Sequence, residues 1–170
     1  MRGILYKAII FLAFLLLIGG CGYHLVSIDA LPYKTVHLGK VENRTFEPGL
    51  KRGFIESFTE TCLENGIDLS AEGPEVRVIL TDYDLVVRSL KNSLSSEYSV
   101  VIKADVSIFY PDGNKHSIKG LSSEFDESFI AGQSVEEINT QRQRVLRDAL
   151  KDLSKRILNE VLYNGIQKAQ

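Results

Sequence analysis

The chain has 170 residues, of which 44% are hydrophobic and 25% are charged, with 20 basic and 22 acidic side chains. A length of this order fits one folded domain that buries a sizeable core. The slightly acidic balance argues against nucleic acid as a partner, since nucleic-acid binding requires a concentrated basic face.

The first 20 residues have three zones in the order typical of a signal peptide. Two basic residues lie near the start (Arg2, Lys7), an apolar run of 11 residues follows at 8–18, and two glycines end the segment. A helix that crosses the hydrocarbon core needs about 20 residues, so a permanent membrane span is the weaker interpretation. Residues 1–20 are therefore predicted to be a cleaved signal peptide.

The residues at the end of this leader, 18–21 (IGGC), resemble the bacterial lipobox, in which small residues precede a cysteine. The family favours Leu where Ile18 stands, which is a mild departure. The resemblance implies that the chain is cut before Cys21 and that Cys21 carries an S-diacylglycerol and an N-acyl chain. Two or more acyl chains anchor a protein stably to a membrane. An ordinary secretory peptide that happens to end beside a cysteine is the alternative.

The residue after the cysteine bears on the choice of membrane. In the lipoprotein family an Asp at that position usually keeps the protein on the inner membrane, and here the residue is Gly22. In a bacterium with two membranes, the resemblance therefore implies the outer membrane.

Loss of the leader would remove two basic residues and no acidic one, which leaves a mature chain with a net charge of −4. If lipid occupies Cys21, the second cysteine, Cys62, has no intramolecular partner, so no disulfide framework is expected. Cys62 lies in the apolar stripe of a predicted helix. It is more readily explained as a small buried hydrophobe than as a nucleophile.

The first half of the mature chain predicts a tether, a strand and a helix. Residues 21–32 have no sustained period, and residues 33–41 read as a short strand. A helix follows, because apolar side chains recur every four positions and two more widen the stripe. Asn65-Gly66 supplies residue types that tolerate the left-handed backbone of a helix end. The stripe consists of Leu50, Phe54, Phe58 and Cys62, widened by Ile55 and Leu63.

A period of two follows, which indicates strands. Residues 98–110 alternate apolar and polar side chains, so one face is expected to be buried and the other wet. In the preceding strand, the apolar phase changes near Thr81-Asp82, which indicates a bulge. Residues 89–96 are predicted to link these two strands.

Pro111-Asp112-Gly113-Asn114 is a strong turn signal that leads into a further strand at 115–126. The apolar phase of that strand changes around Gly120, where a second bulge is expected.

The helical period returns from Ser134 onward. Glu137 stands three residues later, which is the capping-box spacing. The helix is predicted to end at Asn164-Gly165. Its outer face is charged and is interpreted as solvated. The apolar stripe consists of Ile138, Val145, Leu146, Ala149, Leu150, Leu153, Ile157 and Val161.

The element order is therefore β-α-β-β-β-α. It predicts the α+β class, as a two-layer sandwich with two helices packed on a four-stranded, mostly antiparallel sheet. The expected divisions are a signal peptide at 1–20, a lipid-anchored tether at 21–32, one globular domain at 33–166 and a tail at 167–170.

No set of residues typical of an active site is apparent. The three histidines, His24, His37 and His116, are scattered, and none has metal-ligand spacing with another His or Cys. Gly-rich phosphate loops, nucleophile elbows and zinc-protease motifs are missing as well. The sequence predicts neither an enzyme nor a bound cofactor or metal, and the only attached group expected is the lipid on Cys21.

The order and spacing of these pieces are similar to those of the lipopolysaccharide-assembly lipoprotein of the outer membrane, over about 150 residues. No single motif is diagnostic. The matching pieces are 21–25 (CGYHL), Leu31-Pro32, the helix from Phe46 to Leu63 with Gly66 after it, 96–98 (SEY) and 147–153 (RDALKDL).

The resemblance implies a plug inside a large outer-membrane β-barrel, on the periplasmic side, and a role with that barrel in inserting lipopolysaccharide into the outer leaflet. A free-standing periplasmic lipoprotein that binds a small apolar ligand or scaffolds the envelope is the main alternative. An anchored hydrolase is the weakest of the three, because the catalytic residues are missing.

Lipopolysaccharide carries anionic phosphates, so fixed cations are the candidate contacts. The candidates are Arg88 and Lys91, from the basic segment between the second and third predicted strands, and Lys103, from the polar face of the next strand. Arg can grip a phosphate with two parallel hydrogen bonds, while Lys supplies a point charge. A solvated hairpin tip that carries charge for solubility is the alternative interpretation.

Overall fold

The computed structural model describes residues 31–91, 95–123, 129–130 and 134–169. The chain divides into two units, Met1–Ala30 and Leu31–Gln170. The predicted signal peptide, Cys21 and most of the tether lie outside the described residues. The second unit contains all of the elements discussed below.

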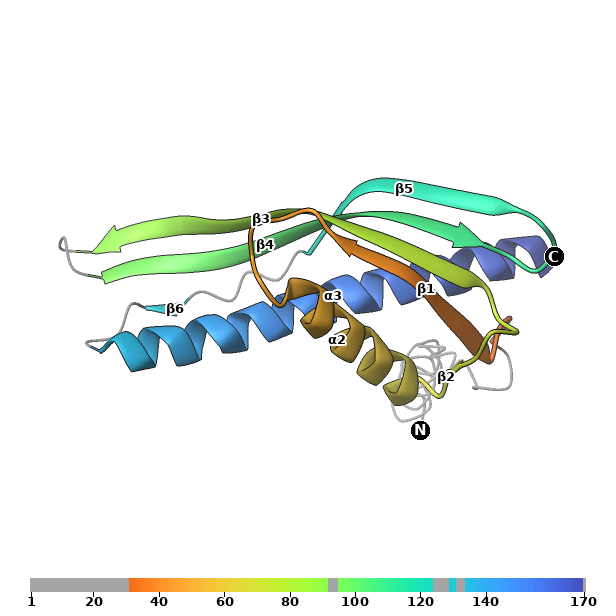
Figure 1. The fold of residues 1–170 in the computed structure, drawn as a ribbon, viewed down its shortest axis with the longest axis horizontal. Helices are drawn as coiled ribbons and strands as arrows, with labels where there is room; N and C mark the ends of the chain where they lie inside the picture. Colours follow the sequence, from red (N-terminus) through yellow and green to blue (C-terminus); the bar gives the residue numbers. More distant parts are fainter. Residues whose placement is uncertain (1–30, 92–94, 124–128, 131–133, 170) are drawn as a thin grey trace, which may run out of the picture. The chain divides into compact units, whose positions relative to one another are not determined.

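Two helices pack on one face of a sheet, so the predicted α+β two-layer sandwich is confirmed (Figure 1). The elements, in chain order, are β1 (Thr35–Asn43), α2 (Leu50–Glu64), β2 (Asp68–Leu69), β3 (Glu75–Lys91), β4 (Ser95–Phe109), β5 (Lys115–Ser122), β6 (Phe129–Ile130) and α3 (Val135–Ala169).

The sheet is mixed, with the strand order β2-β1-β3-β4-β5, and β6 pairs with β4. β1 runs parallel to both β2 and β3, whereas the other pairs are antiparallel. The parallel pair arises because α2 carries the chain back across the sheet before β3 begins. The predicted count of four strands is wrong. β2 and β6 have two residues each, which is too short to produce a period.

β3 and β4 form a long hairpin that replaces the predicted link at 89–96. Their ladder continues to the pair Lys91↔Ser95, so only residues 92–94 separate the two strands. The polar residues here interrupt the apolar alternation, but a ladder is made by backbone groups and does not depend on it. The bulge predicted near Thr81-Asp82 is confirmed, since the register shifts between Leu80 and Asp82.

Helix α2 buries the predicted stripe. Four side chains spaced by four residues, Leu50, Phe54, Phe58 and Cys62, are each 0% exposed. Leu63 is 60% exposed, so the stripe is narrower than predicted. The helix ends as expected, with Gly66 at φ 68° and its N–H donating to the carbonyl of Leu63.

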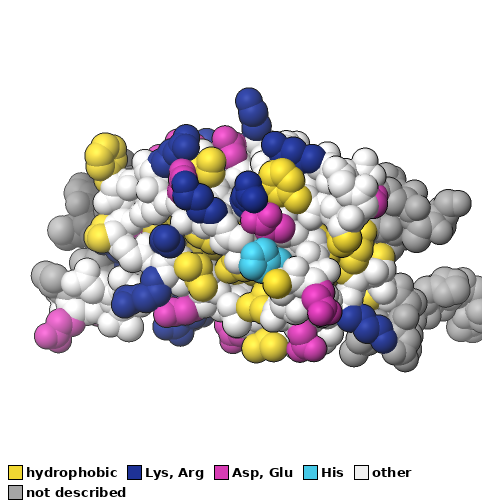
Figure 2. Space-filling view, turned by 45° about the vertical axis from the view of Figure 1, so that its right-hand side comes forward, with side chains coloured by type: hydrophobic (Ala, Val, Ile, Leu, Met, Phe, Trp, Pro, Cys, Tyr) yellow, Lys and Arg dark blue, Asp and Glu magenta, His cyan; other side chains and the backbone are white. Residues whose placement is uncertain are grey.

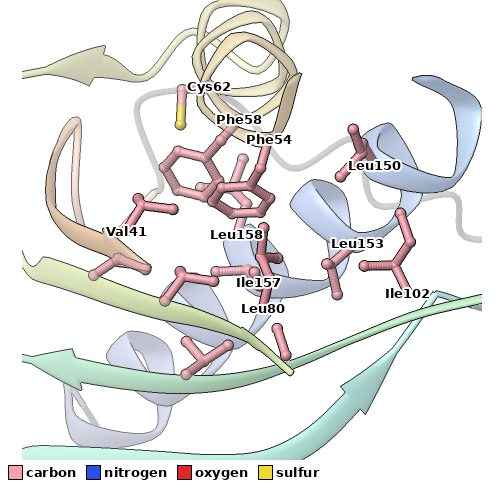
Figure 3. Close-up of a cluster of buried hydrophobic side chains, with 14 of the residues drawn as sticks. Val41, Phe54, Phe58, Cys62, Leu80, Ile102, Leu150, Leu153, Ile157 and Leu158 are labelled. Atoms are coloured by element: carbon pink, nitrogen blue, oxygen red, sulfur yellow. The ribbon is translucent and has the colours of Figure 1, made fainter. Parts of the chain in front are cut away.

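The core lies between the helices and the inner face of the sheet. Figure 3 shows Phe54 and Phe58 of α2 pointing toward the sheet, beside Ile157 and Leu158 of α3. The ring centroids of the two phenylalanines are 5.8 Å apart. On the sheet side, alternate residues of β4 from Val100 to Ile108 are buried, which confirms the predicted alternation.

Helix α3 begins as predicted, because the backbone N–H of Glu137 donates to Ser134 Oγ at 3.2 Å. The prediction that it ends at Asn164-Gly165 is wrong, since the helix continues to Ala169. Asn164 donates its side-chain amide to the Glu160 carbonyl one turn back. A glycine costs a helix about 1 kcal/mol, which the rest of a long packed helix can tolerate.

One glycine has no room for a side chain. A Cβ on Gly73 would lie 2.1 Å from the carbonyl oxygen of Thr35, which is backbone of β1. Gly73→Ala should force β1 and the β2–β3 connection apart and lower the free energy of unfolding by about 1 to 3 kcal/mol. Denaturant titration measures the change.

Gly53→Ala is the comparison variant, because its Cβ would meet the side-chain end of Leu150, at 2.9 Å, and no backbone of a neighbouring element, and helix propensity favours alanine. The steric explanation is wrong if the two variants are equally stable.

Candidate functional site

The cations selected from the sequence all lie on the β3–β4 hairpin. Arg88 is at a register shift between Val87 and Ser89, and Lys91 is the last residue of β3. For both, the structure describes the backbone alone. Lys103 is in β4, opposite Asp82 of β3 and Ser122 of β5.

The hairpin does not bring these three residues together. Lys91 pairs with Ser95, and Lys103 is eight residues farther along β4. At about 3.3 Å per residue, the two lysines are separated by about 26 Å. One phosphate group cannot contact both, so the hairpin offers two separate cationic positions.

The outer face of the sheet points away from the helices, and no described helix covers it (Figure 1). It is the wet face that the alternation in 98–110 predicts. Its side chains are mostly polar or charged and of both signs. They include Glu75, Arg77 and Ile79 of β3, Lys103, Asp105, Ser107 and Phe109 of β4, and Lys115 and Ser117 of β5.

Phe109 is the centre of a cationic cluster on this face. The Arg77 guanidinium carbon lies 4.5 Å from the Phe109 ring centroid, and Lys115 Nζ lies 5.2 Å from it. Arg77 also donates two hydrogen bonds to Glu75, at 2.7 and 2.9 Å. These bonds hold the pKa of the Glu75 carboxyl below its usual value. The cations here are thus held by a carboxylate and a ring.

The surface of the domain carries both signs of charge. On the face that Figure 2 presents, Lys and Arg side chains are mixed with Asp and Glu, and hydrophobic side chains form small separate groups. On this face the basic side chains are therefore not gathered into one continuous patch.

The loop between β1 and α2 presents an apolar side chain that no sequence pattern singled out. Phe46 is 105% exposed. Its neighbours are fixed by hydrogen bonds: Asn43 Oδ1 accepts from the N–H and the hydroxyl of Thr45, at 3.0 and 2.7 Å. Asn43 also donates its side-chain amide to the Glu47 carbonyl at 2.9 Å.

A distant residue of α3 holds the other side of this loop. Arg142 donates to Glu47 Oε2 at 2.5 Å and to the Tyr83 hydroxyl at 3.3 Å. The Glu47 side chain is only 13% exposed, so the ion pair is largely shielded from water. The loop is therefore attached to β3 and α3 while Phe46 projects outward.

A basic trough adjoins the loop. Residues of β1 and α2 line a hollow of about 630 Å³, and its basic members are Lys40, Arg44 and Lys51. Lys40 and Arg44 share Glu42 as their carboxylate partner. The first turn of α2 contains Lys51 and Arg52 and no acidic residue. Cations there are opposed by the helix dipole, by roughly 0.3 to 1 kcal/mol each.

The groove between α2 and α3 is a second hollow, of about 540 Å³. Gly53 lets Leu150 approach α2 at its floor, and Lys151 donates to Glu64 at 2.6 Å across the helix pair. Charged side chains from both helices line the opening, among them Arg52, Glu56, Glu60 and Arg147. The groove is open to solvent, and an apolar ligand would not be enclosed in it.

Cys62 is completely buried, as predicted. Burial raises the pKa of its thiol to about 11, so the reactive thiolate is scarce near neutral pH. We expect iodoacetamide at pH 8 to modify Cys62 at least about 100-fold more slowly in the native protein than in urea. Mass spectrometry measures both rates, and equal rates would contradict the burial.

Because the pKa of the Cys62 thiol differs between the folded and the unfolded chain, the stability of the protein depends on pH. The thiol of an unfolded chain titrates near 8.5, below the folded value, so stability is retained below about pH 8.5 and is lost as the pH rises toward 11.

No group of three metal-binding side chains, counting His, Cys, Asp and Glu, lies close enough together to hold an ion in the part of the chain that the structure describes. Within the same residues, no helix has the length and apolar character needed to cross a membrane.

Comparisons with known proteins show the fold. No protein-family model matches the sequence, and a search of curated proteins found no match. The crystal structure of the rare lipoprotein B from Shewanella oneidensis matches with a TM-score of 0.56 and 10% identity, over 80% of this chain and 99% of that one. A minor lipoprotein from Acinetobacter baumannii matches with a TM-score of 0.47 and 17% identity, over 79% and 96%. The chain shares the fold of the Shewanella lipoprotein.

Proposed function

We propose that this protein is a lipoprotein, anchored through Cys21 to the periplasmic side of the outer membrane. Its globular domain is a plug that binds and stabilises a large β-barrel, and the pair assists insertion of lipopolysaccharide into the outer leaflet. The domain has no catalytic role in this proposal. The lipobox-like residues 18–21 and the fold shared with a bacterial lipoprotein support the anchored part.

The outer face of the sheet is the observation that supports the plug. Both helices cover the inner face, and the outer face carries Arg77, Lys103, Asp105 and Lys115, with serines and only a few apolar side chains such as Ile79 and Phe109. The interior of a large barrel is polar and wet, so a charged, mixed face can sit there without desolvating a large apolar area. A domain that docked on lipid would need an apolar face instead.

The alternative is a free-standing lipoprotein that binds a small apolar ligand. Such ligands occupy concave sites that are mostly apolar and enclose most of the ligand. The hollows of about 540 and 630 Å³ are both open and carry charged side chains at their rims. The described surface therefore favours the plug over an apolar carrier.

Co-purification separates the two functions. The full-length chain, tagged at its C-terminus, should be extracted from the envelope with a mild detergent. A plug should bring down one heat-modifiable barrel in stoichiometric amount, because it sits inside that barrel. Extraction of the chain without such a protein would refute the plug and favour the free-standing lipoprotein.

The lipopolysaccharide contacts require separate variants, since the hairpin separates the cations. Replacing Arg88 and Lys91 by Gln, or Lys103 by Gln, should each weaken lipopolysaccharide binding several-fold and reduce its salt dependence. Thermal stability should not fall. Lys155→Gln, an exposed lysine of α3, is the matched control. Unchanged binding at low salt by all of the folded variants would eliminate both positions and leave the plug role intact.

A further inference from the structure

In the described part of the chain, the aromatic ring of Phe46 is fully exposed, and hydrogen bonds hold the loop that carries it. We propose that Phe46 is the anchor by which this domain docks on its barrel partner, inserting into an apolar pocket that carboxylates surround. The inference rests on the proposed function and adds to it the surface that meets the partner. Phe46 lies in the loop between β1 and α2 (Figure 1).

Hydrogen bonds on both sides of Phe46 hold the backbone of the loop that carries it. The Thr45 hydroxyl donates a hydrogen bond to Asn43 Oδ1, and the backbone N–H of Glu47 donates to Thr45 Oγ1 at 3.2 Å. The Glu47 carboxylate is attached to Arg142 of α3, and the backbone N–H of Arg44 donates to the Leu80 carbonyl at 2.9 Å. An anchor whose backbone is already held by such bonds loses less backbone entropy on binding.

The charges beside the ring indicate the chemistry of the partner. Arg44 precedes Phe46 by two residues, and Arg44, Lys40 and Lys51 line the adjoining trough. Among the described residues, the ion pairs of this region are Lys40–Glu42, Arg44–Glu42 and Arg52–Glu56. Lys51 is in none of them, and the helix dipole opposes a cation at its position. An acidic rim around the partner's pocket would complement these cations, and a basic rim would repel them.

A protein pocket fits this arrangement better than a lipid surface. Membrane association grows with the apolar area that enters the bilayer. The other large hydrophobic side chains that are exposed in the described part of the chain lie on different elements: Leu63 at the end of α2, Leu69 on β2, Leu85 on β3 and Tyr163 on α3. A single projecting ring with a polar surround matches the anchor residues found at the centre of protein interfaces.

The test compares Phe46→Ser with Leu63→Ser in the full-length, acylated chain. Both residues are large, apolar and exposed, and they lie near opposite ends of α2. The amount of barrel recovered per chain after mild detergent extraction should fall about tenfold or more for Phe46→Ser and remain unchanged for Leu63→Ser. The melting temperature should be unchanged in both, because neither side chain belongs to the core.

A charge-reversing substitution tests independently whether acidic residues surround the partner's pocket. Lys51→Glu should reduce barrel recovery, whereas Lys155→Glu, the same change on α3, should not. Recovery that is equal for the parent, Phe46→Ser and Lys51→Glu would overturn this inference and leave the plug intact. A parent chain that recovers no barrel would overturn both.

A vesicle-binding experiment distinguishes docking on a lipid surface from docking on the barrel. The Cys21→Ala chain, which lacks acyl groups, is mixed with vesicles of phosphatidylethanolamine and phosphatidylglycerol and is sedimented with them. Binding of the vesicles should be negligible for this chain and for the same chain with the Phe46→Ser substitution added. If Phe46→Ser abolishes vesicle binding while barrel recovery is unchanged, the occupant is the membrane and the inference is wrong.

Discussion

Replacing Phe58 by alanine should lower the free energy of unfolding by about 3 to 5 kcal/mol. Phe58 is 0% exposed, and its ring packs on that of Phe54 with centroids 5.8 Å apart. The substitution removes the ring from between α2 and the sheet and leaves a cavity that neighbouring side chains fill only in part (Figure 3). For a domain of this size, the melting temperature should fall by roughly 10 °C or more, which calorimetry measures.

Leu63→Ala on the same helix is the control, since an exposed side chain contributes within about 0.5 kcal/mol. Leu153→Ala, at a position that is also fully buried on α3, should cost about 2 to 5 kcal/mol. If the domain is a plug, assembly of the barrel should decline with the stability of these variants. A severely unfolded Phe58→Ala that still supported normal barrel assembly would argue against the plug.

Cys21→Ala should abolish acylation completely and release the folded domain from the membrane. The lipid would be attached to a residue that precedes the globular unit, which begins at Leu31, so the substitution removes none of the described core residues. Each buried methylene of an acyl chain contributes about 0.8 kcal/mol, and this binding is lost with the chains. Metabolic labelling with a radioactive fatty acid measures the modification, and fractionation measures the release.

Cys62→Ala supplies the control for labelling, because it removes the other cysteine of the chain and should leave the fatty acid in place. Barrel contacts could retain an unacylated chain, so release is measured in the Cys21→Ala, Phe46→Ser double variant as well. If that double variant remained as firmly bound to the membrane as the parent, the lipoprotein interpretation would be refuted.

Regular elements with a clear period were predictable from the sequence. The stripe from Leu50 to Cys62 identified α2 and its buried face, and the alternation through residues 98–110 identified β4. The change of phase near Thr81 marked a bulge correctly. These features are local, because the spacing of side chains along a helix or a strand decides which of them face the core.

The candidate site was predictable only in part. Lys103 was expected on a polar strand face, and it lies on one. Arg88 and Lys91 were expected in a link between strands, and they lie in the ladder of a long hairpin. Phe46 was expected near a helix start without a role. The neighbouring Glu47 pairs with Arg142, 95 residues away in sequence, and no local pattern predicts that contact.

The α+β class and most of the core follow from the sequence alone, because the periods of 3.6 and 2 fix which side of each helix or strand is buried. The prediction of a leader and of acylation at Cys21 also rests on residue order alone. The tertiary structure decided the strand neighbours, including the parallel pairing of β1 with β3, since backbone groups of any strand can form a ladder. It decided the spacing of the cations and the projection of Phe46 as well, because these depend on contacts between residues far apart in the chain.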